Sequence, residues 1–288
     1  MIKSYKLRRG ISNAIIYIIL TVMAVIWVLP LFWLILSAFR ADKTVYPSYV
    51  WPPNGFEGFT LNNFKSLFTE TTLFNYPKWF FNTLFVSACS CVLSTLSVLM
   101  VSYTFSRLRF KARKKIMNVA MILGMFPGFM TMIAVYYLLK AIGLTKSLVS
   151  LIIVYSAGAA LGYFISKGFF DTIPRALDEA ATIDGASRNQ IFWKIILPLS
   201  KPIVVYTALT SFIGPWADFI LVSIIMRDEN DKYTIAMGLY KMIQQEYIST
   251  YIMQFYAGAL LIAIPITALF LWMQKYYVEG VTGGAVKG

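Results

Sequence analysis

The chain has 288 residues, of which 58% are hydrophobic and only 14% are charged, and its formal net charge is +13. Soluble domains carry roughly a quarter charged residues, so this composition argues against an ordinary soluble protein and points to a membrane protein. The sequence contains no histidine, which removes the commonest metal ligand and general base, and no GxxxxGK(S/T) loop, which excludes ATP binding of the P-loop kind.

Six apolar stretches are long enough to cross the roughly 30 Å of hydrocarbon in a bilayer, which takes about 20 helical residues. We predict spans at 13–38, 80–104, 116–139, 148–168, 203–224 and 252–274. The first follows basic residues, as a secretory signal would, but it is too long for a signal peptide and has no convincing cleavage site. We therefore expect an all-α membrane protein with six transmembrane helices.

Lysine and arginine are unevenly distributed between the two sides of these spans. Of the 26 basic residues, 17 are Lys167 or lie in segments 1–12, 105–115, 169–202 and 275–288. Because cytoplasmic loops carry the excess of lysine and arginine, we expect a multi-pass protein of the cell membrane with both termini in the cytoplasm. The basicity is thus a topology signal, and nucleic-acid binding is not expected.

Small residues and prolines predict how the spans pack and bend. Pro127 and Pro265 are expected to kink the third and sixth spans. Small side chains allow close helix approach in a bilayer. One such face is expected on the second span, formed by Ser87, Ser90, Ser94 and Ser97.

The connection between the fourth and fifth spans, residues 169–202, reads FFDTIPRALDEAATIDGASRNQIFWKIILPLSKP. Pro174 suits the first turn of a helix, with Asp171 upstream as a candidate cap. Gly185 favours a left-handed turn that ends this helix. A second amphipathic helix follows, and Pro198 marks the return to the membrane. The segment therefore predicts two short helices on the cytoplasmic side.

The polar face of the first short helix is acidic and contains Asp178, Glu179 and Asp184. An amphipathic helix that lies on anionic lipid headgroups would instead carry lysine and arginine there. Ala180 and Ala181 leave a shallow surface that another protein's backbone can approach closely. Docking into a basic groove of a partner protein is therefore favoured over adsorption to lipid, which stays the alternative.

The string EAATIDGA, followed by IILPLSKP, resembles the EAA motif of ATP-binding-cassette (ABC) importer permeases. The resemblance is closest to the maltose-type permeases and extends over essentially the whole chain, including YFISKGFFDTIP, TLNNFKSLF, SIIMRDENDKYTIAMGL and the end AIPITALFLWMQKYYVEGVTGGAVKG. It implies the type I importer (MetI-like) permease fold. It also implies that a coupling helix contacts a partner ATPase through Asp178, Glu179, Ala180, Ala181, Asp184, Gly185 and Pro198.

The same resemblance implies further segments and partners. We expect an N-terminal segment with the first span and an extracytoplasmic loop at 1–79, a permease core at 80–277 and a cytoplasmic tail at 278–288. The expected partners are a second permease subunit, an ATPase dimer, an extracytoplasmic sugar-binding protein and membrane lipids. The tail would contact the ATPase through Gly283, Gly284 and Lys287, and the loop after span five would reach the binding protein through Arg227, Asp228, Asp231 and Tyr233.

The expected function is that of a permease subunit for oligosaccharides, with maltose or maltodextrin as the first choice. Another sugar or a glycerol-phosphate ester stays open, because no residue reads out the substrate directly. We expect no enzymatic activity and no cofactor, since the partner subunits would bind ATP. An ion-coupled secondary transporter is the main rival, but Asp218 is the one acidic residue noted inside the spans. Asp218 could line the pathway or make a structural hydrogen bond.

Overall fold

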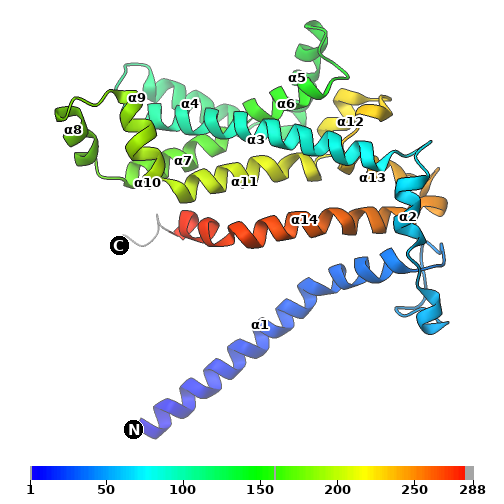
Figure 1. Ribbon diagram of the computed structural model, residues 1–288. Helices are drawn as coiled ribbons and strands as arrows, with labels where there is room; N and C mark the ends of the chain where they lie inside the picture. The colour runs from blue at the N-terminus through cyan, green and yellow to red at the C-terminus, as the bar shows by residue number, and fades with distance from the viewer. Residues whose placement is uncertain (1, 159, 283–288) are drawn as a thin grey trace. The chain divides into compact units, whose positions relative to one another are not determined.

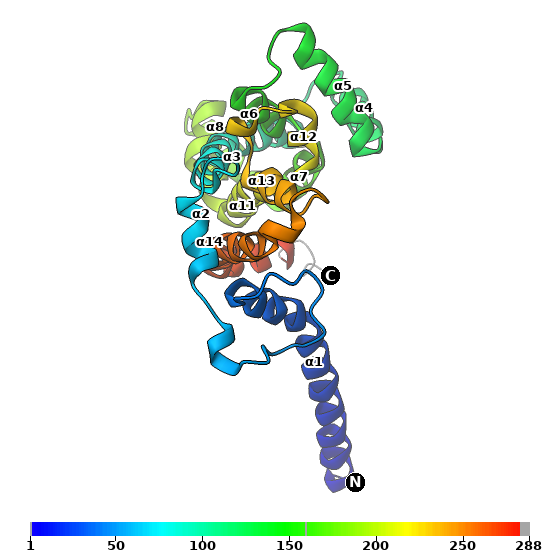
Figure 2. The ribbon, with the colours of Figure 1, turned by 90° about the vertical axis from the view of Figure 1, so that its right-hand side faces the viewer.

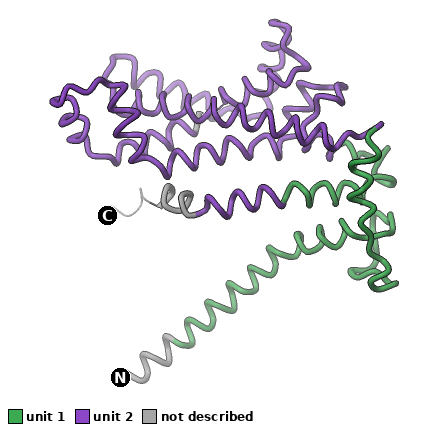
Figure 3. The backbone as a smooth tube through the Cα atoms, viewed as in Figure 1, with its two compact units in different colours: residues 1–71, 241–263 green, residues 72–240, 264–288 purple. Residues whose placement is uncertain are grey.

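The computed structural model describes residues 2–158 and 160–282 (Figure 1). Within them the chain is helical, and the only bridge of the β type joins Arg40 to Phe59. Two compact units are formed: Met1–Thr71 with Lys241–Ala263, and Thr72–Tyr240 with Ile264–Gly288 (Figure 3).

The helices follow one another in this order. The chain begins with α1 (Ile2–Phe39), the 3-10 turn η1 (Gly55–Gly58), α2 (Asn62–Thr69) and α3 (Tyr76–Arg107). Then come α4 (Arg113–Gly124), α5 (Gly128–Ala141), α6 (Leu148–Ala157), α7 (Ala160–Thr172), α8 (Ala176–Ile183) and α9 (Arg188–Ile191). The last elements are the π-helical η2 (Phe192–Ile196), α10 (Leu197–Leu199), α11 (Lys201–Ala217), α12 (Ile220–Met226), η3 (Asn230–Lys232), α13 (Ile235–Met242) and α14 (Ile248–Thr282).

Three helical segments are long and apolar enough to cross a bilayer alone: Gly10–Phe39, Tyr76–Arg107 and Ile248–Gln274. Three bent pairs reach that length together, which gives up to six spans in the described residues. These pairs are Arg113–Gly124 with Gly128–Ala141, bent by 104°, Leu148–Ala157 with Gly162–Thr172, bent by 43°, and Arg188–Leu199 with Lys201–Ala217, bent by 85°.

The structure corrects the expected shape of two spans. The third is not a kinked helix, because the chain breaks before Pro127 and turns by 104° between α4 and α5. The fifth was expected at 203–224, but α11 ends at Ala217 and α12 begins at Ile220. By contrast, α14 continues through Pro265 without interruption.

The second unit is organised around α3, which packs against α6, α7 and α11 (Figure 2). Its buried face carries Ser87, Ser90 and Ser94 as predicted, whereas Ser97 is exposed and the face continues through Val98 and Ser102. The hydroxyl of Ser211 donates to that of Ser94 over 3.1 Å, and Ser102 donates to the Tyr163 carbonyl over 3.0 Å. Small hydroxyl side chains thus let these helices lie close together.

In the first unit, buried polar groups hold the end of α1 to the following loop. The Arg40 side chain is buried and pairs with Asp42 over 3.1 Å, while Asn63 of α2 donates to the carbonyls of Ala38 and Arg40 over 3.0 and 2.8 Å. Tyr49 donates to Asp42 over 2.6 Å. Burial would raise the pKa of Asp42, but the hydrogen bonds from Tyr49 and Thr44 outweigh it and leave this pKa lowered.

Candidate functional site

The loop between α7 and α11 forms the candidate site and contains two short helical segments, as predicted. The first is α8, and the second runs through α9, η2 and α10. Gly185 lies in the turn between them with a φ of +80°, a conformation that side chains with a Cβ rarely adopt. The segments lie at the end of the second unit where α3 ends (Figure 1).

Local sequence explains where these helices begin. The chain enters α8 after Pro174, and the acidic Asp178 and Glu179 in its first turn interact favourably with the helix dipole. A capping box starts α9: the Ser187 hydroxyl accepts from the Gln190 amide over 3.3 Å, and the Gln190 side chain accepts from the Ser187 amide over 2.7 Å. The Ser-x-x-Gln spacing could have revealed this start in advance.

The prediction that Asp171 caps the first short helix is wrong. Helix α7 extends to Thr172, so Asp171 belongs to its last turn. The Asp171 carboxylate instead accepts from the Ser106 hydroxyl over 2.6 Å and pairs with Lys167. This side chain therefore joins α7 to α3.

An apolar face seats both short segments on the bundle. Ala181 of α8 packs in one cluster with Ile191, Phe192 and Ile196, together with Tyr103 of α3 and residues of α7. The Tyr103 ring lies 4.9 Å from that of Phe192. Because these side chains are buried together, the loop is an ordered platform rather than a free connector.

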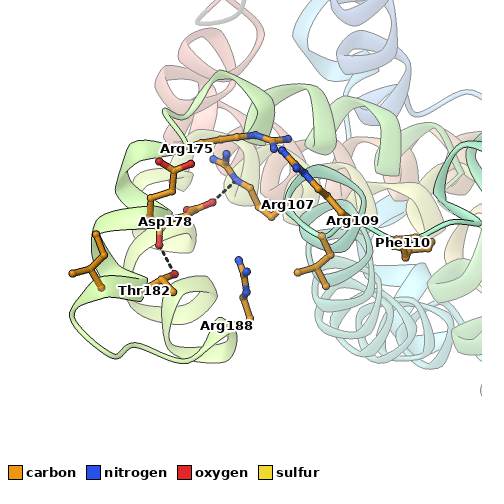
Figure 4. A pocket seen from close by; sticks show the side chains of 10 residues that line it. Arg107, Arg109, Phe110, Arg175, Asp178, Thr182 and Arg188 are labelled. Carbon is orange, nitrogen blue, oxygen red and sulfur yellow. Dashed lines mark hydrogen bonds and ion pairs between the residues drawn. The ribbon is translucent and has the colours of Figure 1, made fainter.

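An ion pair fixes α8 to the end of α3 (Figure 4). Arg107 Nε lies 3.3 Å from Asp178 Oδ2, and the two side chains are 2% and 10% exposed. The Arg107 guanidinium also donates to the carbonyls of Phe170 and Ile173 over 3.0 and 2.9 Å. A second link runs from the residue before α8 to α3, where Arg175 donates to the Ser106 carbonyl over 3.2 Å. Asp178 was expected on a docking surface, but it is buried and holds the loop from inside.

The remaining acidic and small residues of the motif face outward. Glu179, Ala180, Asp184 and Gly185 are exposed, whereas Ala181 is buried. Pro198 is exposed in the first turn of α10. Sequence reasoning missed Ile183, an apolar side chain that is 87% exposed at the end of α8. Its position on the otherwise polar side of the motif helix could have indicated that this isoleucine is exposed.

A cavity of about 790 Å³ opens beside α8 and contains more positive than negative charge. Its charged lining consists of Asp178 and Glu179 and of four arginines, Arg107, Arg109, Arg175 and Arg188. Figure 4 shows the four arginine side chains turned toward the same space. The surface is thus not uniformly acidic as expected, and a partner would meet arginines next to the carboxylate of Glu179.

The loop predicted to reach a binding protein is ordered against α3. Trp79 Nε1 donates to the Asn230 carbonyl over 2.9 Å, and Asn82 donates to the carbonyls of Asp231 and Tyr233 over 2.9 and 3.0 Å. The Ile235 amide donates to the Thr83 hydroxyl over 2.7 Å. Side chains on α3 therefore determine the shape of this loop.

Three of the four predicted contact residues in this loop are exposed, and one is not. Arg227 and Asp228 are exposed, and Asp231 pairs with Lys78 over 2.9 Å near the surface. Tyr233 is only 2% exposed, and its hydroxyl donates to the Arg227 carbonyl. Tyr233 is therefore an internal support of the loop and not part of its outer surface.

The structure favours the structural explanation for Asp218. This residue lies in the break between α11 and α12, where one carboxylate oxygen accepts from the Leu221 amide and the other from the Tyr155 hydroxyl, both over 3.0 Å. The predicted tail residues Gly283, Gly284 and Lys287 lie outside the described residues. In the part of the chain that the structure covers, no group of three or more acidic or cysteine side chains could hold a metal ion.

Comparisons with known proteins agree with this architecture. Residues 94–283 match the family "Binding-protein-dependent transport system inner membrane component". The galactooligosaccharide permease GanQ of Bacillus subtilis is 37% identical over the full length of both chains. The maltodextrin permease MalD of Streptococcus pneumoniae is 35% identical over the full length of both chains, and MdxG of Bacillus subtilis is 36% identical over 97% of this chain and 98% of its own.

Solved structures share the fold. A chain from the crystal structure of a bacterial ABC transporter involved in alginate import aligns with a TM-score of 0.75 at 21% identity, covering 93% of this chain and 96% of its own. A chain from an alginate ABC transporter in complex with its pentasaccharide-bound periplasmic protein aligns with a TM-score of 0.65 at 16% identity, covering 92% and 94%. The chain is therefore a member of the family of inner-membrane permeases of binding-protein-dependent ABC transport systems.

Proposed function

We propose that this chain is one of two permease subunits of an ABC importer for oligosaccharides, with malto-oligosaccharides as the preferred substrate and galacto-oligosaccharides as the alternative. Its full-length similarity to permeases of both kinds supports this substrate class. Partner subunits would bind and hydrolyse ATP, and this chain would carry out no covalent chemistry and need no cofactor. Both termini and residues 105–115 would lie in the cytoplasm.

The observation that carries the proposal is the rigid attachment of α8 to α3 and α7. The Arg107–Asp178 pair and the cluster around Ala181 join α8 to the bundle, while Glu179 and Ile183 face outward. A force that an ATPase exerts on the exposed side of α8 would therefore move α3 and α7 as one body. Such rigid-body movement is a known way to alternate access to a central pathway.

The remaining surfaces would serve the other partners. The ordered loop with Arg227, Asp228 and Asp231 would contact a sugar-binding protein outside the membrane, and photo-crosslinking at Asp231 during turnover should capture it. The tail with Gly283, Gly284 and Lys287 would contact the ATPase dimer, so deletion of residues 283–288 should weaken retention of the ATPase during purification.

Uptake measurements test the coupling role of α8. Glu179→Lys reverses an exposed charge on α8 and should reduce uptake of labelled maltotriose in cells that lack the native permease gene, at unchanged membrane abundance. Glu57→Lys makes the same reversal on an exposed residue outside this loop and outside the proposed binding-protein loop, and it should leave uptake intact. Normal uptake by Glu179→Lys would argue against the coupling role, and uptake of galactotriose but not maltotriose would select the alternative substrate.

A further inference from the structure

A second cavity, of about 550 Å³, lies at the start of α4. Five of the side chains that line it are basic: Arg109, Lys111, Arg113, Lys114 and Lys167. The first four come from the loop after α3 and the first turn of α4, and Lys167 comes from α7, which packs against α4. Residues more than 50 positions apart in the chain thus bring positive charge to one place.

This positive charge is largely uncompensated. Among the described residues, no carboxylate lines the cavity, and the first turn of α4 contains no acidic residue. Lys167 pairs with Asp171, whose carboxylate also attracts Arg113. Arg109, Lys111 and Lys114 form no ion pair within the described residues. The amino-terminal end of α4 adds the positive end of a helix dipole. An anion in the cavity would relieve this repulsion.

The apolar surroundings identify the kind of anion. Phe110 and Met117 line the same cavity. Directly beyond the basic turn, α4 exposes Ile116, Val119 and Ile122, and it belongs to a bent pair that is long and apolar enough to be one span. The cations therefore lie where a membrane-spanning segment begins, which is the level of lipid headgroups.

We propose that this cavity binds the phosphate of an anionic phospholipid, with Lys111, Arg113, Lys114 and Lys167 around the headgroup and Phe110 and Met117 against its glycerol and acyl parts. The inference rests on the membrane orientation proposed above. A free phosphate compound would leave Phe110 and Met117 facing water. An acidic protein segment would bind the cations but would leave the adjoining exposed apolar face of α4 uncovered. Both are outcomes of the test below.

Lipid binding can be measured on the purified full chain by native mass spectrometry with dioleoylphosphatidylglycerol, with dioleoylphosphatidylcholine as the neutral probe. The phosphatidylglycerol should bind more tightly, and the double variant Arg113→Gln/Lys114→Gln should weaken it by roughly 25-fold, since each cation near an anionic lipid contributes a factor of about five. Phosphatidylcholine binding should not change.

Two further variants keep the test decisive. Lys115→Gln/Lys194→Gln removes the same charge from exposed residues that do not line the cavity, and it should retain the affinity. Arg113→Lys/Lys114→Arg keeps both positive charges and should also retain the affinity for phosphatidylglycerol. If it does, the loss in Arg113→Gln/Lys114→Gln comes from the missing charge and not from substitution at these two positions. The assay needs no sugar, ATP or partner subunit, so its result is independent of the transport experiments.

Three results would overturn the proposal. One is equal binding of the anionic and the neutral lipid. Another is an equal loss in the Lys115/Lys194 variant, which would indicate diffuse attraction to the basic surface. The third is displacement of the lipid by millimolar inorganic phosphate or by an acidic peptide, which would assign the cavity to a soluble anion or to a protein segment.

Discussion

Neutralising Asp178 should destabilise this protein, because it leaves the buried guanidinium of Arg107 without its counter-charge. The Nε and Oδ2 atoms are 3.3 Å apart. Two unit charges at that separation attract by about 5 kcal/mol at an effective dielectric constant of about 20. Removal of one partner from a buried pair costs about 3–5 kcal/mol, since the other charge stays desolvated.

Three features of the site place Asp178→Asn at the lower end of that range. Arg107 retains its hydrogen bonds to the Phe170 and Ile173 carbonyls. The 790 Å³ cavity next to the pair admits water, which screens the remaining charge. Arg107 Nε makes no well-aligned hydrogen bond, so the contact with Asp178 is mainly electrostatic. We expect a loss of about 3 kcal/mol, or a melting temperature lowered by about 6–12 °C.

Thermal unfolding of the purified full chain in detergent measures this effect. Arg107→Gln/Asp178→Asn should lose less stability than the two single variants added together, because the second substitution no longer breaks a pair. Asp184→Asn removes an exposed carboxylate from the same loop and should change stability by less than about 0.5 kcal/mol. Equal melting of Asp178→Asn and Asp184→Asn, or strict additivity in the double variant, would refute the reasoning.

Gly185→Ala should lower the free energy of unfolding by about 1–2 kcal/mol, because residue 185 has a φ of +80°, which alanine adopts only with strain; no atom lies within 4 Å of the added Cβ. Gly168→Ala in α7 is the control: its added Cβ also meets no atom within 4 Å, and the helical position should make the variant neutral or stabilising in the same melting assay. In sealed cells with Cys89 and Cys91 replaced, Lys111→Cys should resist an impermeant thiol reagent from outside, because Lys111 is an exposed residue on the expected cytoplasmic side. External labelling of this variant would overturn the topology. Asn82→Ala removes two hydrogen bonds to the loop backbone and should speed hydrogen exchange at residues 228–234, and unchanged exchange would mean that Trp79 and Thr83 suffice to order the loop.

Much of the fold follows from local properties of the sequence. The length of an apolar stretch decides whether a helix can cross a bilayer, so the spans expected at 13–38, 80–104 and 252–274 match single long helices within a few residues. The breaks in the other three were not predictable from length alone. The Gly185 turn was predictable because only glycine enters left-handed backbone conformation without strain. The motif around Glu179 pointed to the permease family, which the match over residues 94–283 confirms.

Tertiary structure decided which side chain of each predicted group faces which neighbour. Asp178 and Glu179 are adjacent and chemically alike, yet one is buried against Arg107 and the other is exposed. Successive residues on a helix point about 100° apart, so the packing of α8 against α3, about 70 positions earlier in the chain, determines their environments. The prediction that Tyr233 lies on an outer surface was wrong for the same kind of reason. Its ring packs near that of Trp79, and no local feature of the sequence indicates this contact.

The basic segment 107–115 shows the same division between sequence and structure. Its composition by itself predicts the cytoplasmic side of the membrane, because that signal depends only on the number of lysines and arginines near a span. Whether these cations surround a cavity depends on the fold, which turns the chain into α4 and brings Lys167 of α7 beside it. Charge is a property of the sequence, but its concentration at one point requires residues from different helices to meet.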